Sequence, residues 1–173
     1  MLFNSQKYFW SKKTPEQTAS DAEKIITYYQ SKWKIRNVII IGYSFGADVA
    51  PFIVTRLSKD TYAAVKNIVL MSPSNLTDFE VHVAQLFGKG KNTGNSVTAE
   101  INKIKQKPLL IIQGVKESEK IGTGSLKVTY KLIGIKGGHR YDSILQKLLI
   151  QFLKTFRVVH LLTLFYNIFK TAK

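Results

Sequence analysis

The chain has 173 residues, and its 26 Lys and Arg exceed its 11 Asp and Glu to give a formal net charge of +15. This length accommodates one domain with a sizeable core, and 45% hydrophobic residues exclude a disordered or collagen-like chain. Cysteine is absent, which excludes disulfides, thiolate zinc sites and a cysteine nucleophile but leaves the cellular compartment open.

The positive charge is concentrated in the second half of the chain. Between residues 101 and 140, nine Lys or Arg are opposed only by Glu117 and Glu119, and no acidic residue follows Asp142. Such an excess is typical of a solvated basic face or of a surface for an anionic partner. Because no aromatic residues alternate with the lysines and no nucleic-acid module is recognisable, a membrane surface fits better than nucleic acid, the weaker alternative.

The ends of the chain give further expectations. Residues 1–10 lack a basic region followed by an apolar segment and a cleavage site, so we expect no signal peptide in this chain. The most apolar stretch, residues 148–169, is interrupted by Lys154, Arg157 and His160, so no membrane span is predicted.

Helices and strands are predicted to alternate along the chain. Thr14-Pro-Glu-Gln17 predicts a capped helix start, and apolar residues at helical spacing extend that helix to about Lys32. Apolar runs predict strands at 37–42, 65–71, 108–113 and 127–133. An apolar helical stretch predicts a helix at 47–57, and a closing helix is expected at 142–156. The order predicts an α/β fold, a mostly parallel sheet flanked by helices, with a surface loop at 88–96.

Gly42-Tyr-Ser44-Phe-Gly46 matches the Gly-x-Ser-x-Gly pattern between a predicted strand and a predicted helix. This is the context of a nucleophile elbow, in which the serine projects beyond the sheet at a helix N-terminus. We expect Gly42 and Gly46 to be required because other side chains would collide in the tight turn. The alternative is a glycine-rich turn with an incidental serine.

A serine needs a base, and in this fold the chain order is serine, acid, histidine. His139 follows the fourth predicted strand in Lys136-Gly-Gly-His139 and is the predicted base. For His82 a structural role is favoured over a place in the site on a cap segment, and His160 belongs to the tail. The acid should follow the third strand, where Glu117 is our choice and Glu119 the alternative. Neither a dinucleotide turn, a P-loop nor metal-ligand spacing is found, so no cofactor or metal is expected.

Several blocks of the sequence together resemble one family. They are Tyr8-Phe-Trp10, Thr14-Pro-Glu-Gln17, Ile41-Gly-Tyr-Ser-Phe-Gly-Ala-Asp-Val49, Pro51-Phe52, Asp78-Phe-Glu-Val-His82 and Gly137-Gly-His139-x-Tyr-Asp142. The chain resembles the VirJ/AcvB bacterial virulence proteins, α/β-hydrolase-fold proteins of the cell envelope. The resemblance implies a periplasmic serine hydrolase with Ser44 and His139 in the active site. It also implies an aminoacylated phospholipid, such as lysyl-phosphatidylglycerol, as the ester substrate, and links to type IV secretion.

The chain also departs from this family. The acidic loop reads Lys116, Glu117 and Glu119 where the family has Asp-Glu and a further Asp, so the acid is retained only as Glu. The family's early strands, export signal and oxyanion loop are expected to be missing, which leaves the Phe45 N–H as one oxyanion donor. We therefore divide the chain into an incomplete hydrolase domain, residues 1–157, and a basic apolar tail, residues 158–173.

Three functional hypotheses follow. The first is a serine ester hydrolase, impaired to the extent that an oxyanion donor is missing. The second is a catalytically impaired binding protein that associates with secretion-system proteins or nucleic acid. The third is a gene fragment without a function of its own; an uncovered sheet edge would also favour a homodimer.

Overall fold

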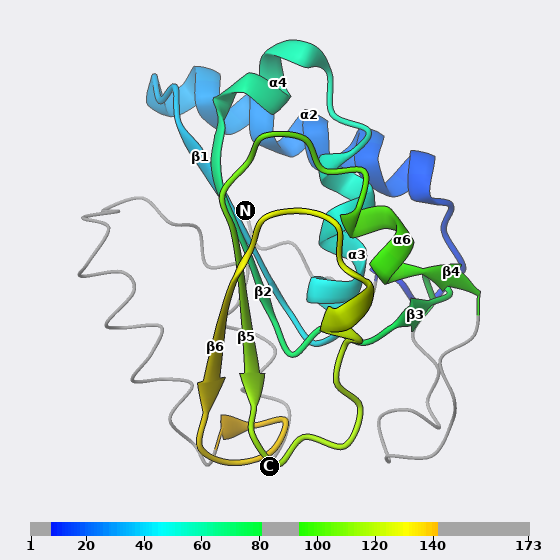
Figure 1. The fold of residues 1–173 in the computed structure, drawn as a ribbon. Helices are drawn as coiled ribbons and strands as arrows, with labels where there is room; N and C mark the ends of the chain where they lie inside the picture. Colours follow the sequence, from blue (N-terminus) through cyan, green and yellow to red (C-terminus); the bar gives the residue numbers. More distant parts are fainter. Residues whose placement is uncertain (1–7, 81–93, 142–173) are drawn as a thin grey trace.

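A computed structural model describes residues 8–80 and 94–141 of the protein (Figure 1). Its first long element is helix α2, Pro15–Trp33, which begins with the predicted capping box. The Thr14 hydroxyl accepts from the Gln17 N–H, and the Gln17 side chain accepts from the Thr14 N–H, both at 3.1 Å. The helix ends at Lys34, whose φ of 51° is left-handed, so both predicted ends lie within about a residue of the observed ones.

The strands form a parallel sheet in the order β1–β2–β5–β6. Their bounds are β1 Val38–Tyr43, β2 Val65–Met71, β5 Leu109–Gly114 and β6 Lys131–Ile135. The β-branched run of β2 is predicted with its observed ends, and β1 and β5 are each displaced by one residue. The parallel pairing of these strands confirms the prediction of an α/β fold with a mostly parallel sheet.

Helix α3, Phe45–Val54, follows β1 and packs against β1, β2 and α2. Short elements complete the described fold: helices α4 Lys59–Ala64 and α6 Val97–Ile101, the 3-10 turn Thr123–Ser125, and strands β3 Leu76–Thr77 and β4 Asn95–Ser96, which pair antiparallel. The sequence pattern did not predict these elements, because segments of two to six residues carry little periodicity.

The bounds of two expected elements are corrected. The fourth strand ends at Ile135 rather than at 133 and begins at Lys131 rather than at 127, because the Lys127 N–H is bound to the Asn102 side chain at 2.7 Å and Tyr130 packs against the core instead of pairing with β5. Helix α3 begins at Phe45 and ends at Val54, earlier than the predicted 47–57. The predicted helix 142–156, the tail 158–173 and most of the loop 88–96 lie outside the described residues; within that loop, Asn95–Ser96 is β4.

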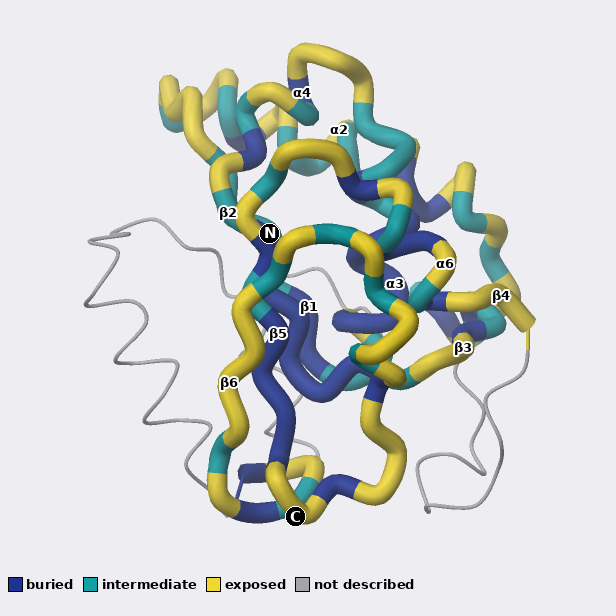
Figure 2. Tube along the Cα trace, viewed as in Figure 1, coloured by how far each residue is buried: buried dark blue, intermediate teal, exposed yellow. Residues whose placement is uncertain are grey.

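Both faces of the sheet carry apolar residues. Ile68, Leu70 and Ile111 face α3 and form the larger cluster, while Val69 and Ile112 face the other way. Figure 2 shows β2 and β5 as the buried centre of the sheet and β6 as its exposed edge. None of the described helices is long and apolar enough to cross a membrane.

Candidate active site

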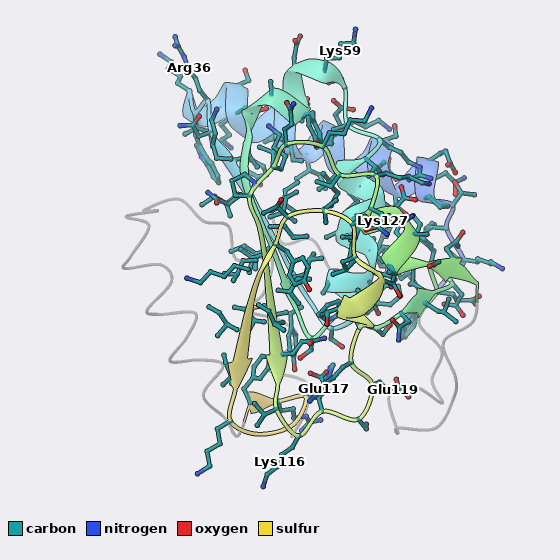
Figure 3. All side chains as sticks on the ribbon, viewed as in Figure 1. Arg36, Lys59, Lys116, Glu117, Glu119 and Lys127 are labelled. Atoms are coloured by element: carbon teal, nitrogen blue, oxygen red, sulfur yellow. The ribbon has the colours of Figure 1, made fainter. Side chains whose placement is uncertain are left out.

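Strand order brings three distant segments to the carboxyl edge of the sheet. Because the strands are parallel, the residues that follow β1, β5 and β6 emerge at the same edge. Ser44 follows β1, Glu117 lies three residues after β5, and His139 lies in the loop after β6. Figure 3 shows Glu117 and Glu119 at this edge, with Arg36 and Lys59 at the opposite end of the molecule.

Ser44 occupies a strained turn between β1 and α3. Its φ of 53° and ψ of −126° are unusual for a residue with a side chain, and they mark the sharp strand-to-helix turn of a nucleophile elbow. A Cβ atom on Gly42 would lie 2.3 Å from the Gly46 carbonyl oxygen, so glycine is required there. At Gly46, a Cβ would meet no atom within 4 Å in the described part of the chain outside its own helix. The expected collision therefore applies to Gly42 and is wrong for Gly46.

Ser44, His139 and Glu117 are joined by hydrogen bonds. His139 Nε2 lies 2.8 Å from Ser44 Oγ, and His139 Nδ1 lies 2.5 Å from Glu117 Oε1. The His139 side chain is 47% exposed, whereas that of Glu117 is 3% exposed. The buried carboxylate thus binds one nitrogen of the imidazole, and the other nitrogen contacts the serine hydroxyl. This arrangement prepares a serine for nucleophilic attack.

Glu117 is kept ionised by its partners. Burial raises the pKa of this carboxyl, but hydrogen bonds from His139, Ser72 and the Gly114 N–H outweigh burial and lower the pKa below its ordinary value. An ionised Glu117 can stabilise the imidazolium that forms when His139 takes a proton.

Among the other candidates named from the sequence, the structure describes Glu119 but neither His82 nor His160. Glu119 is exposed in the same loop, and the structure places Glu117, not Glu119, against His139. His82 and His160 lie outside the described residues. Within residues 8–80 and 94–141, no group of three or more His, Asp or Glu is arranged to hold a metal ion.

The Phe45 backbone lies where the sequence predicts an oxyanion donor. Phe45 directly follows Ser44 and is the first residue of α3, whose initial N–H groups have no acceptor within the helix. Its ring packs edge-on against Phe9, with centroids 4.9 Å apart, which anchors this turn against the N-terminal segment.

Close backbone packing positions the histidine loop. A Cβ on Gly114 would lie 2.3 Å from the Gly138 carbonyl oxygen and 2.7 Å from that of Gly137, so only glycine allows the two loops to approach this closely. The Tyr43 hydroxyl donates to the His139 carbonyl at 3.0 Å, which fixes the same loop from β1.

A second buried carboxyl, Asp48, lies on the first turn of α3. Its two oxygens accept from the Ser74 N–H at 2.6 Å and the Ser74 hydroxyl at 2.9 Å. Burial raises the pKa of Asp48 to about 7 despite these hydrogen bonds. Asp48 thereby links the helix behind Ser44 to the turn after β2.

The sequence did not predict the roles of Tyr43, Asp48, Ser72 and Tyr141. For Asp48 a signal was present, because a carboxyl within an otherwise apolar helical run implies a buried partner. Ser72 and Tyr141 carry no such signal, since their contacts depend on how separate strand ends meet.

Comparison with solved structures places the fold among the α/β hydrolases. Est1E from Butyrivibrio proteoclasticus, solved with ferulic acid bound, superposes with a TM-score of 0.54 at 16% identity over 84% of this chain and 68% of Est1E. Bromoperoxidase from Bacillus anthracis gives a TM-score of 0.55 at 12% identity over 86% of this chain and 75% of that chain. The α/β hydrolase MGS-MChE2 from a Mar Chica lagoon metagenome gives 0.51 at 15% identity, over 80% and 71%.

Sequence comparison supplies the family. No curated protein sequence matches the chain. The family model for the bacterial virulence protein VirJ matches residues 1–159, a range that contains Ser44, Glu117 and His139. Family and fold together support a hydrolase. The chain belongs to the VirJ family of bacterial virulence proteins.

Proposed function

We propose that the protein is a serine hydrolase that cleaves esters. The observation that carries this proposal is the continuous hydrogen-bonded series Ser44–His139–Glu117, assembled at the carboxyl edge of the sheet. Its three members follow separate strands, so their alignment depends on the fold as a whole.

In the proposed reaction, Ser44 Oγ attacks the ester carbonyl carbon while His139 Nε2 takes the hydroxyl proton. The carbonyl oxygen becomes an oxyanion, which the Phe45 N–H stabilises. His139 then gives the proton to the leaving alcohol oxygen, and the acyl group remains on Ser44. Water, deprotonated by His139, attacks this acyl ester, and the acid leaves as Ser44 regains its proton.

The family resemblance and the charge together suggest the substrate class. We propose an aminoacylated phospholipid, with lysyl-phosphatidylglycerol as the test case and the periplasm as the compartment. Exposed basic residues in the acid and histidine loops support an anionic lipid surface as partner; they are Lys116, Lys120, Lys136 and Arg140. Such residues attract anionic headgroups in a salt-dependent manner.

A fluorophosphonate probe tests the nucleophile. The parent protein should be labelled covalently, while Ser44→Ala should not be labelled, and His139→Asn should be labelled far more slowly. A parent protein that is folded by circular dichroism and remains unlabelled would contradict the proposal.

The substrate is tested with vesicles. Lysine should be released from vesicles that contain lysyl-phosphatidylglycerol, and release should stop in Ser44→Ala and fall as salt is raised. Labelling by the probe without lysine release would retain the serine hydrolase and reject this lipid.

A second candidate function is supported by the net charge of +15. In this alternative the protein binds an anionic partner, nucleic acid or an acidic secretion-system protein, and does not turn over substrate. Steeply salt-dependent DNA binding by a parent protein that the probe does not label would favour this alternative.

A further inference from the structure

The turn after β2 lies between the strands that carry the candidate triad. Strand β2 pairs with β1, which leads to Ser44, and with β5, which leads to Glu117. The Met71 carbonyl accepts from the Ser44 N–H at 2.8 Å, and the Ser72 N–H donates to the Ile112 carbonyl at 2.8 Å. Met71 and Ser72 therefore hold both neighbouring strand ends at the edge where the triad is assembled.

Ser72 contacts the carboxylate directly. The residue is 2% exposed, and its hydroxyl donates to Glu117 Oε2 at 2.9 Å. The Gly114 N–H donates to the same oxygen at 3.2 Å. With Oε2 fixed by two donors, Oε1 is left directed at His139.

Tyr141 completes a chain of hydroxyls behind Ser72. Its side chain is fully buried, and its hydroxyl lies 2.6 Å from Ser72 Oγ and 3.2 Å from the Ile112 carbonyl. Ser72 has one hydroxyl proton, which it donates to the carboxylate. In the 2.6 Å contact between the two hydroxyls Tyr141 is therefore the donor, and its single proton is shared between Ser72 Oγ and the Ile112 carbonyl oxygen, which can only accept.

We infer that Ser72 and Tyr141 are positioning residues, which fix the orientation of the Glu117 carboxylate by a buried hydroxyl relay and act on Ser44 through Glu117 and His139. This inference rests on the proposed serine hydrolase. The backbone agrees with a dedicated role, because Ser72 and Tyr141 have φ values of 50° and 51°, a left-handed conformation that is uncommon outside glycine.

The relay predicts a change in titration. Groups that face Glu117 are His139 and Tyr141 after β6, Tyr43 at the end of β1 and Asp48 on α3. Ser72 is a hydrogen-bond donor that lowers the pKa of Glu117, so its removal should raise this pKa and bring protonation of the carboxylate closer to neutral pH.

Three variants of the full chain test the inference: Ser72→Ala, Tyr141→Phe and the double variant. The first readout is the pH dependence of the labelling rate with the fluorophosphonate probe. Ser72→Ala should reduce the rate about tenfold at pH 8, and by more at pH 5, because the lower pH lies closer to the raised pKa of the carboxylate. Tyr141→Phe should act in the same direction with a smaller effect, and should add little to Ser72→Ala because it acts through that hydroxyl.

The second readout is a ¹³C NMR titration of the Glu117 carboxyl, which needs no activity. Its midpoint should be higher in Ser72→Ala and Tyr141→Phe than in the parent protein. Ser74→Ala is the matched control in the same turn: Ser74 binds Asp48, so this variant should lower the melting temperature and leave the Glu117 midpoint unchanged.

The outcomes separate the two proposals. An unlabelled parent protein contradicts the serine hydrolase, and the NMR midpoint then still reports whether the hydroxyls stabilise the carboxylate. Folded variants with the NMR midpoint of the parent protein would overturn the relay, whether or not the parent protein is labelled. A rate loss equal at pH 5 and pH 8, with no change in midpoint, would also overturn it and assign a packing role.

Discussion

Glu100 and Glu117 are two equally buried carboxylates with different partners. Their side chains are 4% and 3% exposed, and hydrogen bonds lower the pKa of both despite the opposing effect of burial. Glu100, on α6, is bound by Arg56 at 2.5 Å, by Lys103 at 2.6 Å and by the Thr55 hydroxyl. Glu117 instead has an imidazole as its basic partner.

The difference shows what distinguishes a structural carboxylate from one suited to proton transfer. The ion pairs of Glu100 with Arg56 and Lys103 hold α6 against the end of α3, and neither partner carries an imidazole. An imidazole is a chemical group that can take up and release a proton during a reaction, and the other nitrogen of the His139 imidazole contacts Ser44. Burial therefore does not distinguish the candidate catalytic carboxylate from Glu100, whereas the chemistry of the basic partner does.

The largest expected effect comes from Glu117→Gln. The labelling rate should fall by about 10³–10⁴-fold, because a neutral amide cannot stabilise the imidazolium or fix its tautomer. Glu119→Gln, in the same loop but exposed, is the control and should keep the parent rate. Equal losses in the two variants would mean that the Glu117–His139 contact has no catalytic role.

Gly114→Ala tests whether loop packing holds His139 in place. Its Cβ would lie 2.3 Å from the Gly138 carbonyl oxygen, so the histidine loop must move. A displacement of about 1 Å at a reacting group can reduce the rate about 10²-fold. Gly124→Ala is the control, since its Cβ would meet no described atom within 4 Å. Parent-like labelling by Gly114→Ala would show that the loop position is not critical.

Glu100→Gln should show the opposite pattern, a loss of stability with the labelling rate retained. The expected loss is about 1–3 kcal/mol, below that of a fully buried ion pair because Arg56 and Lys103 can turn toward water. Since the pKa of Glu100 is lowered, its contribution is present above pH 4.5 and is lost as the pH falls through the folded-state pKa. Urea unfolding at pH 7 and pH 4 measures the loss of stability and its dependence on pH, and the fluorophosphonate probe measures the labelling rate.

Glu16→Gln is the control for this variant, because Glu16 also binds Arg56 but its side chain is 70% exposed. It should change stability little. If Glu100→Gln is labelled more slowly than the parent protein at the same fraction of folded molecules, Glu100 also contributes to the reaction. The distinction between the two carboxylates would then be wrong.

The sequence predicts the parts of the fold that depend on local pattern. Strand β2 and the capping box of α2 follow from a β-branched run and from two residues at fixed spacing. The order of Ser44, Glu117 and His139 follows from strand alternation and the elbow motif. The contacts of Ser72 and Tyr141 could not be predicted, because they require the strand order β1–β2–β5–β6, which brings the end of β2 beside the loop after β5.

Asp48→Asn is expected to give the smallest effect, and it extends the comparison to a third buried carboxyl without a basic partner within hydrogen-bonding distance among the described residues. Burial raises the pKa of Asp48 to about 7. The protonated group therefore favours the folded state most at low pH, and this contribution is lost as the pH rises from about 4 through 7. Asparagine is neutral throughout and can still accept from the Ser74 N–H.

Melting temperatures at pH 5, 7 and 8 test this expectation. The parent protein should be the more stable of the two at pH 5, and the difference should shrink or reverse by pH 8. Comparison at the same pH cancels the contributions of Glu100 and Glu117, whose lowered pKa values act in the opposite sense. A difference that stays constant with pH would mean that Asp48 remains ionised in the folded protein, with its charge balanced by Ser74 and the N-terminus of α3.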